Sequence, residues 1–391
     1  MTIIRNGIGS SAANVSNMLS ILRTAPTIEG RVNPNGTANY TWDGSDNGQL
    51  SFTKKAQAYG NITVIADAWS APPFMKTNND EIYSGYICGV TGTSCATGDW
   101  RQAYANYLAQ YVGFYAQEGI PIKYIGFVNE PDLNEPYPSM GTSGAQAADF
   151  INVLYPTLKA ANLSTGISCC DGSGWYAESV YTSGLASVAS KLAIRSSHPY
   201  STPATYSLTT LQPTWQTEWS NQKGANYTTE WYSGENNPGE GLIWATNIYT
   251  GLTSGNCSAY LYWQGAQYGE YVNTALLSVN FDGTLTVPKR LWAFAQFSRG
   301  VRPGAVRVAT TSSTTNVKLS AFQNLDGSLA IQTINSASSA YNVTLTLKGL
   351  TGMKVASWLT DNNNNFTAWD GALTSVTGSV PPCSFVSFIV S

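Results

Sequence analysis

The stretch "KYIGFVNEPDLNEP" (Lys123–Pro136) consists of a short apolar run followed by two copies of Asn-Glu-Pro. Its first eight residues, Lys123–Glu130, have the length and composition of a buried β-strand that ends in a glutamate. Glu135 stands between prolines that cannot continue a strand, so we expect it in a loop. The stretch therefore predicts a strand that brings one carboxylate, that of Glu130, to the edge of a sheet.

Strands of this kind alternate with amphipathic helices over about the first 300 residues. The clearest helix is expected to begin after Asp99, as N-cap, and to end at Gly119; others are expected at 145–161, 239–251 and 288–298. Such alternation predicts a parallel sheet, and because no Gly-rich phosphate loop follows any strand, a (β/α)8 barrel is favoured over an open doubly wound sheet. The predicted strands are Thr2–Gly7, Ile62–Trp69, Lys123–Glu130, Gly166–Asp171, Leu192–Tyr200, Thr214–Ser220 and Ala259–Gly265.

These are seven strands rather than the eight of a complete barrel, and the chain opens directly on the first of them. We therefore expect the first β/α unit of the barrel to be absent. After residue 300 the pattern changes to short alternating strands separated by Ser, Asn, Asp and Gly, which predicts an antiparallel β-sandwich. The expected domains are a catalytic barrel over 1–299 and a side domain over 300–391.

The composition favours a ligand without charge. Charged residues make up 11% of the chain, against about 25% in an average soluble domain, while aromatics reach 12% and the net charge is −3. No run of Lys and Arg exists, so nucleic acid and anionic membranes are poor partners, and no apolar run approaches the roughly 18 residues of a membrane span. A polar, aromatic-rich surface suits sugars, and we expect a monomer.

Sequons and cysteines together indicate a secreted protein, although no signal peptide is visible at Met1. Cys88 and Cys95 bracket a short loop that a disulfide could close, whereas Cys169 and Cys170 are interpreted as buried thiols. A bond between Cys257 and Cys383 is considered. The sequons begin at Asn14, Asn35, Asn39, Asn61, Asn162, Asn226, Asn256, Asn342 and Asn365.

The only histidine is His198 and no Cys-X-X-Cys occurs, so neither a metal nor a cofactor is expected. The chemistry is instead predicted to come from two glutamates. Glu218, in "TWQTEWS", lies 88 residues after Glu130 and three predicted strands later. Two glutamates facing each other at a barrel mouth are the minimum apparatus for glycoside hydrolysis. Arg5 could keep one of them ionised, although an arginine at a strand end is more often part of a structural salt bridge.

Several motifs, in the same order, resemble glycoside hydrolase family 30, and most closely its fungal xylanase branch. They are "RNGIGSS", "DAWSAPPFMKTNN", "CGVTGTSCATGDW", "GFVNEP", "SSHPY", "WQTEW" and "YWQGA". The resemblance implies a retaining (β/α)8 hydrolase in which Glu130 is the acid/base and Glu218 the nucleophile. It also implies that Asn129 binds the sugar 2-hydroxyl and that Arg5 lies near the nucleophile. The residues implied to line the glycone cleft are Trp69, His198, Tyr200 and Trp263.

The chain departs from the family in two ways. The family has a further strand before "TIIRNG", and its bacterial glucuronoxylanases hold a glucuronic acid branch with an arginine in the loop after the last barrel strand. Between Trp263 and Lys289 this chain has no Lys or Arg, so its dependence on the acidic branch should be weaker. We expect an endo-type β-1,4-xylanase acting on xylan or glucuronoxylan. The alternatives are a relative acting on β-1,6-glucan or β-1,6-galactan, and a non-catalytic carbohydrate-binding barrel.

Overall fold

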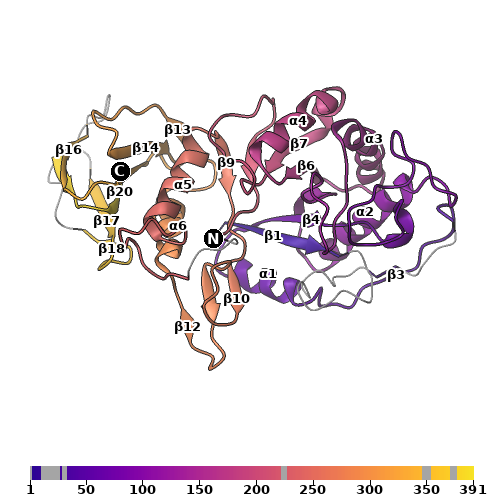
Figure 1. Cartoon of the computed structure of the whole chain (residues 1–391), viewed down its shortest axis with the longest axis horizontal. Coiled ribbons are helices and arrows are strands. Elements are labelled where there is room, and N and C mark those ends of the chain that lie inside the picture. Colours follow the sequence, from indigo (N-terminus) through magenta and orange to yellow (C-terminus); the bar gives the residue numbers. More distant parts are fainter. Residues whose placement is uncertain (1, 10–26, 29–32, 222–226, 346–353, 370–376) are drawn as a thin grey trace. The chain divides into compact units, whose positions relative to one another are not determined.

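The computed structural model describes residues 2–9, 27–28, 33–221, 227–345, 354–369 and 377–391 (Figure 1). The sequons at Asn14 and Asn226 lie outside these ranges. The chain forms two compact units. The first comprises Met1–Glu218 and Gly255–Leu261, and the second comprises Trp219–Ser254 and Tyr262–Ser391. The sequence predicts one domain over 1–299 and another over 300–391, whereas the two units draw on segments that alternate along the chain. The expected boundary stays a prediction.

The first unit is built on a parallel sheet, whose seven strands in the described residues form an incomplete barrel of the (β/α)8 type. The strands pair in the order in which they occur in the sequence, and each lies within or overlaps a strand that the sequence predicts. The predicted fold class is therefore confirmed. The strands are β1 (Ile3–Ile8), β4 (Thr63–Ala68), β5 (Ile122–Gly126), β6 (Gly166–Gly172), β7 (Leu192–Ser197), β8 (Thr214–Gln216) and β9 (Cys257–Tyr260).

Side-chain alternation explains why polar groups gather at one end of this sheet. Ile3 and Ile65 belong to a small apolar cluster on one face, together with Ile194. Successive side chains of a strand point to opposite faces, so the residues two positions further along return to the same face. In β1 that residue is Arg5 and in β4 it is Asp67. These two strands thus place an apolar residue on this face and, two positions nearer to their carboxyl ends, a charged residue.

Helices cover the other face of the sheet. In α2 the residues Tyr104, Leu108, Tyr111, Val112 and Tyr115 are all buried, and Gly119, with φ of 78°, follows the helix as predicted. The N-cap is Trp100 rather than Asp99, although a carboxylate oxygen of Asp99 still accepts from the N–H of Arg101 at 3.0 Å. No helix in the described part of the chain is long and apolar enough to cross a membrane. The helical elements are α1 (Gln49–Gln57), η2 (Pro73–Met75), α2 (Arg101–Gln117), α3 (Gly144–Ala160), α4 (Trp175–Leu185) and η3 (Ala186–Lys191), and a short pair β2 (Thr27–Ile28) and β3 (Tyr40–Thr41) precedes α1.

The second unit contains the predicted antiparallel sandwich, with a six-stranded and a two-stranded sheet in the described residues. Helices α5 (Gly241–Thr253) and α6 (Lys289–Gly300), both predicted, pack on this sandwich. A separate three-stranded sheet consists of β10 (Ala266–Tyr268), β11 (Leu277–Val279) and β12 (Leu285–Thr286) (Figure 1). The sandwich strands are β13 (Val306–Val308), β14 (Val317–Gln323), β15 (Leu329–Asn335), β16 (Tyr341–Thr344), β17 (Val355–Thr360), β18 (Thr367–Ala368), β19 (Thr377–Val380) and β20 (Ser384–Val390).

The cysteines bear out one prediction and correct two others. Cys88 and Cys95 form the predicted disulfide. Cys169 and Cys170 were expected as buried thiols. They are instead joined to each other, in a part of β6 whose register against β7 shifts on either side of them. Cys257 and Cys383 are both free thiols, so the bond considered between them is absent.

Candidate active site

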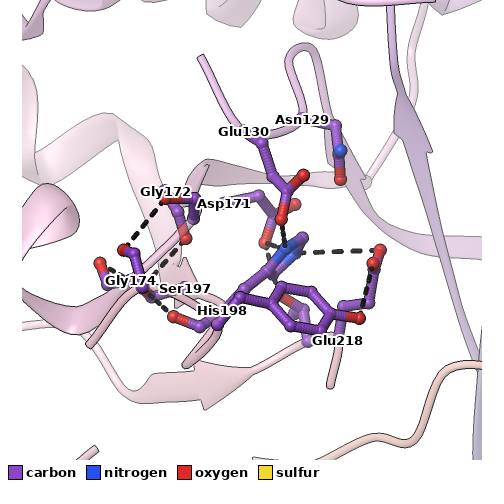
Figure 2. A network of polar contacts seen from close by, with 12 residues as sticks. Asn129, Glu130, Asp171, Gly172, Gly174, Ser197, His198 and Glu218 are labelled. Atoms are coloured by element: carbon purple, nitrogen blue, oxygen red, sulfur yellow. Dashed lines mark hydrogen bonds and ion pairs between the residues drawn. The ribbon is translucent and has the colours of Figure 1, made fainter. Parts of the chain in front are cut away.

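The structure brings Glu130 and Glu218 together at the carboxyl ends of the parallel strands. Glu130 follows β5 and Glu218 follows β8, and their exposed fractions are 7% and 5%. One carboxylate oxygen from each, with one ring nitrogen of His198, lie within 4.8 Å of one another. Figure 2 shows the imidazole of His198 between the two glutamates. All three residues belong to the first unit.

Glu218 is held by one cation and one hydroxyl group. The Arg5 guanidinium donates to its Oε2 at 2.6 Å, and the Tyr200 hydroxyl donates to its Oε1 at 3.1 Å. Burial raises the pKa of Glu218, while the charges of His198 and Arg5 lower it, and the net shift is upward. Both carboxylate oxygens are therefore fixed in place, and the positive charges limit how far burial can favour the protonated form.

Glu130 is held in a matching way by an imidazole and a hydroxyl group. His198 Nδ1 lies 2.9 Å from its Oε1, and the Tyr137 hydroxyl donates to its Oε2 at 3.1 Å. The backbone of Glu130 has φ of 45°, in the left-handed region that non-glycine residues seldom occupy. Such a conformation has an energetic cost and is found most often at functional sites. The chain thus turns away sharply after β5 while the glutamate stays in the site.

His198 is fully buried, and the carboxylates around it favour its charged form. Its backbone N–H donates to the Gly172 carbonyl at 2.9 Å, which fixes the backbone of His198 against the end of β6. Its Nε2 lies 3.7 Å from Asp171 and 4.0 Å from Glu218. Burial lowers the pKa of His198, but the three surrounding carboxylates outweigh burial and raise it. The surrounding carboxylates therefore favour the charged form of the imidazole.

Arg5 connects four polar side chains beneath the glutamates. Besides Glu218, its guanidinium donates to Asp67 at 2.7 Å, to the amide oxygen of Asn129 at 2.7 Å and to Asp171 at 3.4 Å. It also lies over the ring of Trp69, 4.5 Å from the ring centroid. One of the partners of Arg5 is thus Glu218 itself, and its role in the reaction stays a prediction.

Seven of the eight site residues expected from the sequence lie in this network. The eighth, Trp263, belongs to the second unit, where its backbone N–H donates to the backbone carbonyl of Trp219 at 2.9 Å. Glu135 lies in the loop after β5, as predicted. Sequence reasoning did not single out Tyr137 or Asp171. Asp171 ends the predicted strand "GISCCD" and could have been found by its position, whereas Tyr137 lies in a loop whose path no sequence pattern indicated.

Glu130, His198 and Glu218 also form the one group among the described residues whose donor atoms are close enough together to hold a metal ion. Two carboxylates and an imidazole are ligands that zinc accepts. Each carboxylate, however, already has a nitrogen and a hydroxyl partner from the chain, and the Arg5 charge lies 2.6 Å from Glu218. The donor set therefore suits proton transfer and nucleophilic attack better than metal binding.

The family to which this site belongs follows from comparison with known proteins. The sequence model of O-glycosyl hydrolase family 30 matches residues 1–205, and that of the glycosyl hydrolase family 30 beta sandwich domain matches residues 304–388. The chain belongs to glycoside hydrolase family 30. The resemblance seen in the sequence motifs is thereby confirmed.

Proteins with different named activities resemble the chain. The catalytic domain of xylanase C from Talaromyces cellulolyticus is 42% identical, with a TM-score of 0.89 over 100% of this chain and 88% of that one. A glucuronoxylanase of Bacillus subtilis strain 168 is 28% identical over 39% of this chain and 35% of its own length. An endo-1,6-β-D-glucanase of Trichoderma harzianum is 33% identical over 32% of this chain and 27% of its own length. The chain thus matches only about a third of these two curated relatives.

Proposed function

We propose that this chain is a retaining glycoside hydrolase that cleaves β-1,4-xylosidic bonds of xylan or glucuronoxylan. The observation that carries the mechanism is the distance between the two glutamates: one carboxylate oxygen of Glu130 lies within 4.8 Å of one carboxylate oxygen of Glu218. Retaining enzymes have carboxyl groups about 5–5.5 Å apart, whereas inverting enzymes need about 6.5–9.5 Å to admit a water molecule. The similarity to the Talaromyces xylanase supports xylan as the substrate.

In this proposal the partners of each glutamate decide its role. Glu218, with Arg5 and Tyr200 donating to its two oxygens, is the nucleophile that attacks the anomeric carbon. Glu130 donates a proton to the departing glycosidic oxygen, and a covalent glycosyl–enzyme ester forms. Glu130 then takes a proton from water, whose oxygen attacks the anomeric carbon and releases Glu218 with retention of configuration. Asn129, whose amide oxygen accepts from Arg5, directs its N–H group elsewhere and would offer it to the sugar 2-hydroxyl.

Product analysis tests the proposal. The chain is incubated separately with glucuronoxylan, arabinoxylan, β-1,6-glucan and β-1,6-galactan, and the products are identified by mass spectrometry, with the anomeric configuration followed by NMR. We expect short xylo-oligosaccharides released first as the β-anomer. Products only from a β-1,6-linked polymer would keep the mechanism and overturn the substrate, and release of the α-anomer would overturn the assignment of a nucleophile.

A matched set of variants tests the two roles. Glu218→Gln should lower kcat by on the order of a thousandfold or more with the fold intact, because an amide cannot form the glycosyl ester. Glu130→Gln should cause a comparable loss. Glu135→Gln removes the same group from the second Asn-Glu-Pro copy, and we expect it to change kcat less than about threefold. Normal turnover by Glu218→Gln would exclude it as nucleophile, and turnover absent even from the unaltered chain on all four polymers would favour a binding protein.

A further inference from the structure

Two buried aspartates lie behind the glutamates and have no part in the proposed reaction. Asp67 in β4 is 0% exposed and Asp171, in β6, is 1% exposed. Both contact the same terminal nitrogen of Arg5, at 2.7 and 3.4 Å. Asp171 has further partners, because its Oδ1 accepts the hydroxyl of Thr217 and lies 3.7 Å from His198 Nε2. Among the described residues, Arg5 is the one cation that forms an ion pair with Asp67.

The charges in this buried region do not balance if every acid is ionised. Four carboxylates, those of Asp67, Glu130, Asp171 and Glu218, face only two cations, Arg5 and His198. An unpaired charge away from water costs several kcal/mol, and such groups usually take up or lose a proton instead. In the proposed reaction Glu130 carries the proton that it donates, and the remaining three carboxylates still outnumber Arg5 and His198, so one further acid is expected to be neutral when no substrate is bound.

The position of Asp67 makes it the neutral acid. Its Oδ1 packs against the backbone of Gly126, where an added Cβ would lie 1.8 Å away, and no donor from the described residues reaches this oxygen. Its carboxyl contacts the same nitrogen of Arg5 as the Asp171 carboxyl, at 2.7 and 3.4 Å, and a hydrogen bond between the two acids is among the causes that shift the pKa of each. Two ionised carboxylates cannot hydrogen-bond to each other, whereas a carboxylic acid can donate to a carboxylate. One proton shared between Asp67 and Asp171 would explain why the two acids lie close together and would also reduce the excess of negative charge.

We propose that Asp67 and Asp171 form a carboxylic acid–carboxylate pair that positions Arg5 against Glu218, with Asp67 holding the proton and donating it to Asp171. The proposal rests on the proposed function, in which Glu218 is the nucleophile. With Asp67 neutral, the charge of Arg5 is shared between Asp171 and Glu218 instead of among three carboxylates. The pair consists of positioning residues, since neither touches the reacting atoms.

The electrostatic surroundings agree with this assignment. Burial and the nearby charge of Asp171 raise the pKa of Asp67 well above its usual value, although Arg5 opposes them. Burial alone would raise the pKa of Asp171, but Arg5 and His198 outweigh it and the net shift is downward. The other titratable group that faces Asp67 is Tyr104 of α2, whose hydroxyl donates to the Phe127 carbonyl and remains protonated.

Asparagine at each position gives an asymmetric test. An amide at residue 67 can donate to Asp171 and accept from Arg5, as a protonated acid does, so Asp67→Asn should lower kcat less than about tenfold. An amide at residue 171 cannot supply the anion, so Asp171→Asn should lower kcat at least about a hundredfold with a smaller change in KM. Equal losses would mean that both acids are ionised, the reverse order would place the proton on Asp171, and two small losses would overturn the positioning role.

A stability measurement tests the proton itself, whatever the substrate proves to be. Above a pH of about 4 the unfolded chain ionises Asp67 while the folded chain keeps its proton, so the folded state binds more protons and loses stability as pH rises. Asp67→Asn removes this dependence. We therefore expect the Tm of Asp67→Asn relative to the unaltered protein to increase from pH 4 to pH 7. The infrared difference spectrum between the two proteins should show the loss of the band of one protonated carboxylic acid. A constant Tm difference with no lost band would overturn the proposal and leave the proposed function untouched.

Discussion

At the scale of single residues, the two glutamates have the same chemistry and differ only in their neighbours. Each carboxylate has one tyrosine hydroxyl on one oxygen and one nitrogen on the other. The nitrogen is a permanent cation, Arg5, at Glu218, and a titratable imidazole, His198, at Glu130. A nucleophile must stay ionised and an acid/base must exchange its proton, so this difference is the physical basis for the proposed roles.

The hydroxyl of Tyr200 provides a prediction about pH. It donates to Glu218 at 3.1 Å and favours the ionised form, which burial disfavours. Tyr200→Phe removes the hydrogen bond, so the pKa of Glu218 rises further and the acidic limb of kcat/KM should move to higher pH, with a loss of about tenfold at the optimum. Tyr137→Phe removes the equivalent hydroxyl from Glu130 and should leave the acidic limb in place. An acidic limb that moves in Tyr137→Phe and not in Tyr200→Phe would contradict the assignment.

At the scale of elements, the sequence located the parallel strands because buried strands of this kind are short, apolar and bounded by turns. It also located Glu130 and Glu218, since both directly follow such strands. It could not locate what depends on contacts between distant segments. The register of β6 against β7, which shifts on either side of Cys169 and Cys170, is one example. Another is the helix α1, whose Gln49 exchanges two hydrogen bonds with the backbone of Gly7.

The loops after β4 and β5 are joined by a buried lysine. The ammonium group of Lys76 donates to the Ser139 carbonyl at 2.7 Å, to Ser70 Oγ at 3.0 Å and to the Glu81 carbonyl at 3.3 Å. Ser139 lies two residues after Tyr137, whose hydroxyl reaches Glu130. Burial lowers the pKa of Lys76 to about 7, although Asp80 and Glu81 oppose this shift. The lysine therefore links the two loops, and the free energy needed to bury its charge depends on pH.

We expect Lys76→Met to lower the free energy of unfolding by about 1–3 kcal/mol, because it leaves buried acceptors without a donor. Between pH 7 and about 10 the unfolded lysine keeps a proton that the folded one has lost, so the stability contributed by Lys76 rises with pH. The deficit of Lys76→Met should accordingly widen over this range in denaturant titrations. Lys55→Met, at an exposed position of α1, is the control and should show a flat and small difference. A deficit that shrinks with rising pH would be the contrary result.

At the scale of the whole molecule, the sequence predicted both architectures but not how the chain divides between them. The helices α5 and α6 follow the last two parallel strands in sequence, yet they group with the sandwich. Periodicity predicts that a helix has an apolar face, but it does not indicate which sheet that face will cover. For the same reason Trp263 was predictable as an aromatic residue after a strand, but not its membership of the second unit.

The charge distribution of the whole chain leads to a prediction about substrate branches. No Lys or Arg lies between Trp263 and Lys289, and charged residues make up only 11% of the sequence. A carboxylate on the substrate therefore finds no guanidinium in this segment to pair with. Under the proposed function, removing the glucuronic acid branches from glucuronoxylan should change kcat/KM less than about threefold. A loss of a hundredfold or more, measured on the same polymer before and after debranching, would reveal a cationic group elsewhere that selects the branch.

The close approach of Asp67 Oδ1 to Gly126 makes the two positions interdependent in evolution. Any side chain at residue 126 would occupy the space of a carboxyl oxygen, so a lineage that keeps the aspartate must keep the glycine. A lineage that shortens residue 67 is released from that restriction and can accept alanine at residue 126. An alignment of relatives should therefore show residues 67 and 126 changing together. A library that randomises both residues at once should recover functional variants with a side chain at residue 126, which substitution of Gly126 alone does not yield.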